Sequence, residues 1–316
     1  DAELHIEAPI QASIPSLNGP IFLWRWAARE NADDSLNFRL PLEWTEFDEI
    51  QLRVELNADR AIPETDYGNN RYVLKVTFHE RRPLRIRYVP VRLPRNPSLP
   101  DEREMRRAET LARTIFPLRQ GDLHYVRGAT LDYDDGIRTD AELEVFNLWL
   151  DALDSLGRLL GQGLPAYDQL VAWFPMQPHP RPGIYGWSDP LWMDPPGPGR
   201  VSVVMSAGAF FTNPLPPFAR NPDPHFDAHT MAHEVAHNLG LRHSSNFSKP
   251  PTAAQACRAW SDVDFWPYTT VDIQEVGYQV LASGQSALRL ASRHADFMSY
   301  CNFNTGHGTF DSREGG

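Results

Sequence analysis

The residues in this chain best suited to carry out chemistry are three histidines and a glutamate between positions 233 and 243. His233 and His237 are four residues apart, so on a helix both imidazoles lie on one face and can reach the same metal ion. Glu234 follows the first histidine and can hold a metal-bound water. Gly240 tolerates the left-handed backbone with which many helices end, so the chain can turn back and present His243 as a third ligand. Three histidines leave a fourth position open for water, which is the plan of a catalytic zinc site.

The run from His233 to His243 resembles the zinc signature of the metzincin metallopeptidases, H-E-x-x-H-x-x-G-x-x-H, at every fixed position. Residues 296–301 read Asp-Phe-Met-Ser-Tyr-Cys and resemble the Met-turn that follows this signature in the same clan. The resemblance implies that Met298 packs beneath the zinc without coordinating it. It also implies that Tyr300 is close to the metal, as a movable ligand or as a hydrogen-bond donor to the oxyanion, with a packed tyrosine as an equal alternative.

The resemblance also implies a reaction, the hydrolysis of peptide bonds in a protein or glycoprotein substrate. Zinc held by neutral imidazoles lowers the pKa of its water from about 15.7 to about 7. Glu234 then takes the proton and delivers it to the departing amine, without a covalent intermediate. The Met-turn, together with the flanking Cys257 and Cys301, is similar to that of secreted bacterial proteases of the pappalysin or mucin-cleaving type. We therefore expect a secreted zinc endopeptidase.

Two other functions remain open for this chain. One is a protease directed at glycoproteins or mucins, whose N-terminal part binds a glycan or the cell surface. The other is a binding protein or adhesin whose protease domain is inert, although the three histidines and Glu234 are all present and argue against decay.

Composition limits the class of partner and indicates the compartment. A net charge of −11 makes a nucleic acid or an anionic membrane an unfavourable partner, and no run of 18 apolar residues could insert into a membrane. The N-terminus lacks the basic and apolar regions of a signal peptide, so we expect a processed piece of a longer protein. Cys257 and Cys301 are the two cysteines, and one disulfide between them would suit an exported protein. Two buried thiols in a cytosolic enzyme are the alternative.

Two further groups of residues could bind metal, and a simpler interpretation is favoured for each. An acidic turn could supply carboxylates to calcium, with Asp132, Asp134 and Asp135 followed by Gly136. The remainder of an EF-hand loop is absent from the sequence, so an ordinary turn is favoured. His225 and His229 precede His233 at helical spacing, but a second metal would need more ligands than they supply, and we expect surface or capping histidines.

Residues 1–82 predict a small all-β module that resembles an immunoglobulin-like sandwich. Apolar residues alternate with polar ones over 52–56 and 72–78, as in half-buried strands, and turn-forming residues fill 57–70 between them. Residues 64–70 resemble the last hairpin of immunoglobulin-like modules in exported bacterial proteins. A spacer or stabilising role is favoured for this module over ligand binding.

Residues 83–316 predict a metzincin-like catalytic domain of α/β (α+β) class, after a polar boundary that ends at Pro83. We expect strands at 84–91, 123–126, 169–174, 183–187 and 201–205, and helices at 101–116 and 139–160. The run Ser98-Leu99-Pro100-Asp101 can cap the first helix, and Thr139 with Glu142 forms a capping box for the second, which we expect to back the sheet.

The zinc helix should start near Asp227 or Thr230, either of which can cap it. In metzincins a strand that lines the cleft precedes the zinc helix and pairs with extended substrate, and residues 200–206 are our candidate for it. The last fifteen residues show no convincing helix, which departs from many members of the clan.

Overall fold

The computed structural model describes residues 2–19, 21, 34–94, 99–119, 121–134, 137, 139–159, 167–175, 186–188, 199–206, 226–241, 277–280, 286–289 and 298. The chain divides into two compact units, Asp1–Arg82 and Pro83–Gly316. This division falls where the polar segment ending at Pro83 predicts a boundary. None of the helices in the described part of the chain is long and apolar enough to cross a bilayer.

The first unit contains an antiparallel sheet in the order β2-β1-β3-β4. Its strands are β1 (Ala2–Ala8), β2 (Ala12–Pro15), β3 (Glu49–Leu56) and β4 (Arg71–Thr77), and two short 3-10 helices are η2 (Leu42–Glu46) and η3 (Gly68–Asn70). The two predicted strands are β3 and β4, paired so that Leu52 lies opposite Leu74. One face of the sheet is apolar and packs with Trp44 of η2. The described residues of this unit include no second sheet of the predicted sandwich.

The turn-forming segment between β3 and β4 is held by its own polar side chains. Asn57 Nδ2 donates a hydrogen bond to the Ile62 carbonyl at 2.7 Å, and Asn57 Oδ1 accepts one from the Ile62 N–H at 3.0 Å. Asn70 Nδ2 donates to Glu64 Oε1 at 2.9 Å. The asparagines that predict a turn here therefore hold the loop together with side-chain hydrogen bonds, in place of the main-chain hydrogen bonds that join paired strands.

The second unit is built on a mixed sheet in the order β6-β5-β8-β10-β9, with β7 paired to one end of β5. Its strands are β5 (Leu84–Arg92), β6 (Leu123–Arg127), β7 (Leu131–Asp132), β8 (Gln169–Phe174), β9 (Gly186–Ser188) and β10 (Val201–Met205). β11 (Gly277–Val280) and β12 (Ser286–Arg289) pair antiparallel in a separate two-stranded sheet. β5, β6, β8 and β10 run parallel, whereas β9 is antiparallel to β10. The predicted bounds of β8 and β10 are confirmed, as is the mixed α/β class.

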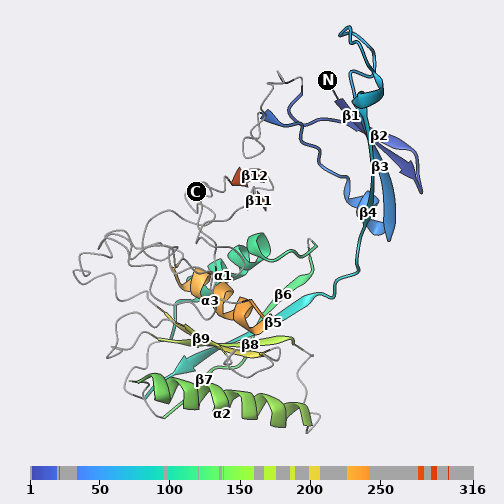
Figure 1. Cartoon of the computed structure of the whole chain (residues 1–316). Helices are drawn as coiled ribbons and strands as arrows, with labels where there is room; N and C mark the ends of the chain where they lie inside the picture. The colour runs from blue at the N-terminus through green and yellow to red at the C-terminus, as the bar shows by residue number, and fades with distance from the viewer. Residues whose placement is uncertain are drawn as a thin grey trace, which may run out of the picture. The chain divides into compact units, whose positions relative to one another are not determined.

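Three helices of the described chain cover the two faces of this sheet, as Figure 1 shows, with α1 (Glu102–Ile115) and α3 (Phe226–Asn238) on one face and α2 (Asp140–Leu159) on the other. The predicted capping box of α2 is confirmed, and of the run 98–101 predicted to cap α1, Asp101 is the N-cap whereas Ser98 lies outside the described residues. Asp101 Oδ1 accepts a hydrogen bond from the Arg103 N–H at 2.9 Å. In the capping box, the Glu142 N–H donates to Thr139 Oγ1 at 3.2 Å and the Thr139 N–H donates to Glu142 Oε2 at 2.9 Å.

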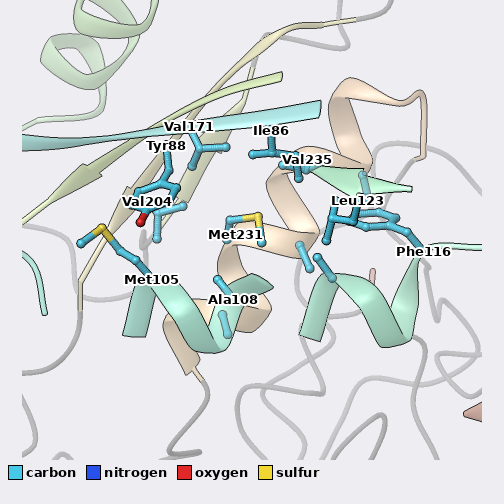
Figure 2. Close-up of a cluster of buried hydrophobic side chains, with 14 of the residues drawn as sticks. Ile86, Tyr88, Met105, Ala108, Phe116, Leu123, Val171, Val204, Met231 and Val235 are labelled. Atoms are coloured by element: carbon cyan, nitrogen blue, oxygen red, sulfur yellow. The ribbon is translucent and has the colours of Figure 1, made fainter. Parts of the chain in front are cut away.

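Each face of the sheet carries its own hydrophobic core. Figure 2 shows side chains of α1, α3 and the strands meeting in the first core, which includes Met105, Ala108, Met231, Val235 and Ile86. The second core joins α2 to the opposite face through Leu143, Phe146, Leu150, Ala172 and Phe174. The helix predicted to back the sheet therefore does cover it, but on the face away from α3, and α1 is the helix packed beside α3.

One prediction about the sheet is wrong. The strand at 200–206, our candidate for the strand that pairs with substrate, is β10, and both of its edges are already occupied by β8 and β9. All five of its residues are buried, as expected for an interior strand. The edge position belongs to β9, whose side away from β10 has no partner among the described strands.

Candidate metal centre and general base

His233 and His237 lie on one face of α3 with their rings directed at each other, as their spacing predicts. Their Nε2 atoms are 3.0 Å apart, and the rings are nearly perpendicular, at 89° with centroids 4.6 Å apart. Both side chains are buried, with 3% and 5% of their surface exposed. Two nitrogens that can carry lone pairs thus converge in a space from which water is largely removed.

The end of α3 fixes which nitrogen of His237 carries the hydrogen. His237 Nδ1 is 2.8 Å from the Leu241 carbonyl oxygen, which can only accept, so Nδ1 donates and Nε2 keeps its lone pair. The carbonyl reaches the ring because the helix ends in a Schellman turn, with the Gly240 N–H donating to the His237 carbonyl and the Leu241 N–H to that of Ala236. Gly240 has φ +93°, so the predicted left-handed helix end is confirmed.

This pair fits a zinc ion. Zinc binds histidine nitrogens at about 2.0–2.1 Å, so two nitrogens on a tetrahedral ion are about 3.3 Å apart. The observed 3.0 Å needs only a small adjustment, and a carbonyl that orients a ligating imidazole is usual around zinc. His243, the predicted third ligand, lies outside the described residues. Within those residues, no group of three or more His, Cys, Asp or Glu side chains could hold a metal.

Glu234 lies beside this pair and is buried, with 8% of its surface exposed. Burial raises the pKa of its carboxyl to about 8, and a hydrogen bond from the Ser188 side chain acts in the opposite direction. A cation held by the neighbouring histidines would favour the ionised form and lower this pKa again. The predicted general base is therefore the residue next to a proposed metal ligand, His233, in buried surroundings that strengthen any charge interaction.

Sequence reasoning missed the role of β9, which packs against Glu234. A Cβ placed on Gly186 would lie 2.4 Å from Glu234 Oε1 and 2.7 Å from Thr230 Cγ2, so this position admits no side chain unless α3 moves. The available signal was a glycine inside the strand predicted at 183–187, and a glycine in a strand often marks the close approach of another group.

Asn238 is a second residue that sequence reasoning missed. It follows His237 and is fully buried. Its Nδ2 lies 2.8 Å from Gln169 Oε1, 2.8 Å from Ser202 Oγ and 3.1 Å from the Val201 carbonyl oxygen. The last turn of α3 is thereby tied to β8 and β10. An asparagine inside a helix, beside a predicted ligand, was the signal for this anchor.

The start of α3 differs from prediction in two respects. The helix begins at Phe226, so Asp227 lies in its first turn, where Asp227 Oδ2 accepts a hydrogen bond from Ser206 Oγ at 2.8 Å. The prediction of a surface or capping residue is wrong for His229, which is only 5% exposed. The reason is that α3 is enclosed, with every residue from 227 to 238 buried. His225 lies outside the described residues.

The remaining predicted site residues are only partly within the described chain. Met298 is buried in the same hydrophobic core as Ala232, Val235 and Ala236 of α3, which is where a Met-turn methionine is expected. Tyr300, Cys257 and Cys301 lie outside the described residues, and the disulfide remains a prediction.

The acidic turn predicted as a possible calcium site is described only in part. Asp132 is exposed and forms an ion pair with Arg92, with Asp132 Oδ1 3.3 Å from Arg92 Nη1. Asp134 is also exposed. Asp135 and Gly136 lie outside the described residues, so calcium binding remains a prediction.

Comparison with known proteins assigns no family, because no family model matches the chain and no curated protein matches it. The functional proposal therefore depends on the motif and on the geometry of α3 and β9.

Proposed function

We propose that this chain is a secreted zinc-dependent endopeptidase of the metzincin clan. The observation that carries the proposal is the convergence of His233 Nε2 and His237 Nε2 at 3.0 Å, with His237 oriented by the Leu241 carbonyl. A buried carboxyl group, Glu234, lies on the same helix. Two imidazoles directed at one point beside a buried glutamate are the arrangement that metal-assisted hydrolysis needs.

In this proposal the histidines bind a zinc ion and Glu234 transfers protons. His233 and His237 hold the zinc, together with His243 from the sequence motif. A zinc ion held there would supply the positive charge that polarises the peptide carbonyl and makes a nearby water more acidic. Glu234 accepts a proton from the attacking water at a carboxylate oxygen and delivers it to the nitrogen of the departing amine. The enclosure of α3 keeps bulk water away from this transfer.

The edge position of β9 supports an extended peptide as the substrate. An extended chain can add to an edge strand through main-chain hydrogen bonds, and the side of β9 away from β10 has no partner among the described strands. Glu234 packs against the same strand. A peptide paired with β9 would therefore run close to the general base.

A digestion experiment with zinc analysis tests the proposal. Casein and a mucin-type glycoprotein would be incubated with the wild-type protein and with Glu234→Gln, and bound zinc would be measured in both. We expect Glu234→Gln to retain zinc but to lose turnover by about 100-fold or more, since proton transfer by such groups contributes about 10²–10⁴-fold. Full proteolysis by Glu234→Gln would overturn the proposed role of Glu234.

The same assay, repeated without residues 1–82, separates the kinds of substrate. If casein and the mucin-type glycoprotein are both cleaved, and deletion of residues 1–82 does not change the rates, the activity is general proteolysis. Cleavage of the mucin alone, dependent on residues 1–82, indicates glycan-directed proteolysis. Glycan binding without zinc or cleavage would indicate an inert adhesin.

A further inference from the structure

β9 presents its alternating side chains to two different layers of the second unit. Successive residues of a strand point to opposite faces, so Gly186 and Ser188 share a face and Trp187 points the other way. Trp187 packs against the core formed with α2, and Gly186 contacts Glu234 and Thr230 of α3. Positions 186 and 188 therefore face the helix that carries the proposed metal ligands.

The missing side chain at Gly186 creates the space in which Glu234 lies. A Cβ at this position would be 2.4 Å from Glu234 Oε1 and 2.6 Å from Glu234 Cγ, well inside van der Waals contact. The same Cβ would be 2.7 Å from Thr230 Cγ2, one helical turn away from Glu234. Any larger residue at 186 would thus displace the carboxylate or push α3 away from the sheet.

Ser188 lies two residues further along the same face, and its side chain forms a hydrogen bond with Glu234. Glu234 is buried, so few waters are available to replace this bond. A hydrogen bond to a buried carboxyl group has a stronger effect on orientation than one at the surface.

We propose that Gly186 and Ser188 are positioning residues for the general base, Gly186 by providing the space for the Glu234 side chain and Ser188 by orienting its carboxylate. The term general base rests on the proposed function. In the proposed function an extended peptide pairs with the side of β9 that has no partner among the described strands, so β9 would set the positions of both the substrate and the base.

The contact itself can be tested without zinc by comparing thermal unfolding midpoints. Ser188→Ala would be made in the wild-type protein and in Glu234→Ala, with Ser155→Ala, an exposed serine of α2, as the matched control. We expect Ser188→Ala to lower the midpoint by about 2–4 °C in the wild type and by less than about 1 °C in Glu234→Ala. Equal shifts in both backgrounds would overturn the proposal.

The positioning role can be tested with steady-state kinetics of the zinc-loaded protein. We expect Ser188→Ala to reduce kcat about 10- to 100-fold with KM and zinc content nearly unchanged, because a small misplacement of a reacting group has effects of this size. Ser188→Thr keeps the hydroxyl and should retain kcat, whereas Gly186→Ala should lose it. A lower unfolding midpoint with unchanged kcat in Ser188→Ala would show a merely structural role and overturn the proposal.

The two experiments distinguish an error in the positioning proposal from an error in the proposed function. If the unfolding midpoints show coupling between Ser188 and Glu234 but the wild type has no zinc-dependent peptidase activity, the proposed function is overturned and the positioning of Glu234 by β9 stands. If the wild type is active and the coupling is absent, the positioning proposal is overturned and the function stands.

Discussion

Replacement of Asn238 by alanine should destabilise the second unit by removing the anchor at the end of α3. The Asn238 side chain is fully buried, and its Nδ2 lies within 3.1 Å of Gln169 Oε1, Ser202 Oγ and the Val201 carbonyl oxygen. Alanine removes the donor and leaves these oxygens buried. Some of them then lose a hydrogen bond that water cannot restore.

The size of the effect follows from the number of hydrogen bonds. An amide has two N–H groups, so two bonds are lost at about 1 kcal/mol each, and the buried acceptors left behind add about 1 kcal/mol. The free energy of unfolding should therefore fall by about 3 kcal/mol, which lowers the thermal midpoint of a unit of this size by about 6–12 °C. Zinc affinity should fall about tenfold, because the proposed ligand His237 is the residue immediately before Asn238.

Differential scanning calorimetry and zinc titration would measure both effects. Leu239→Ala is the matched control, because Leu239 is adjacent but 49% exposed, and it should change either quantity little. Asn238→Asp keeps the shape but places a carboxylate among acceptor oxygens, so it should be at least as destabilising as alanine at neutral pH. A midpoint for Asn238→Ala within about 1 °C of the wild type would refute the reasoning.

Three further substitutions test local features of the second unit. Gly240→Ala should lower the free energy of unfolding by about 1–2 kcal/mol, because φ is +93° at this position and an alanine is strained in that conformation. An unchanged free energy in denaturant unfolding would contradict this expectation. Thr139→Ala should cost about 1 kcal/mol by removing the capping box of α2, measured in the same way. Burial raises the pKa of the Glu104 carboxyl in the folded protein above its value in the unfolded chain. The folded state therefore holds this proton more tightly, and the resulting stabilisation is present below the pKa of the unfolded chain and is lost as the pH rises through the pKa of the folded protein. The thermal midpoint of Glu104→Gln relative to the wild type should therefore increase from pH 4 to pH 7, and a decrease would contradict this sign.

Local sequence signals predicted the features of the fold that depend on neighbouring residues. The cap at Asp101, the capping box at Thr139 and the helix end at Gly240 each depend on chemistry within a few residues, and all three are present. The strand at 169–174 was predicted with its observed bounds, because it is a short apolar run between turn residues.

The order of strands could not be predicted in the same way, because pairing joins residues far apart in the sequence. The choice of residues 200–206 as the substrate-pairing strand followed from their place before the zinc helix, although the nearly continuous apolar run at 201–205 indicates burial on both faces. Gly186 to Ser188 is too short to show a period, so its antiparallel edge position was not visible. His229 was expected to be a surface or capping histidine because the sequence shows too few ligands for a second metal, and only tertiary packing shows that α3 is enclosed.

Zinc binding by the purified protein tests the central claim most directly. A competition titration against a chromophoric chelator would give the stoichiometry and the affinity for the wild type, His237→Ala and Glu234→Gln. We predict one zinc ion per chain, affinity at least about 100-fold lower in His237→Ala, and affinity within about threefold of the wild type in Glu234→Gln. Absence of tight zinc binding in the wild type, or undiminished binding in His237→Ala, would contradict the account.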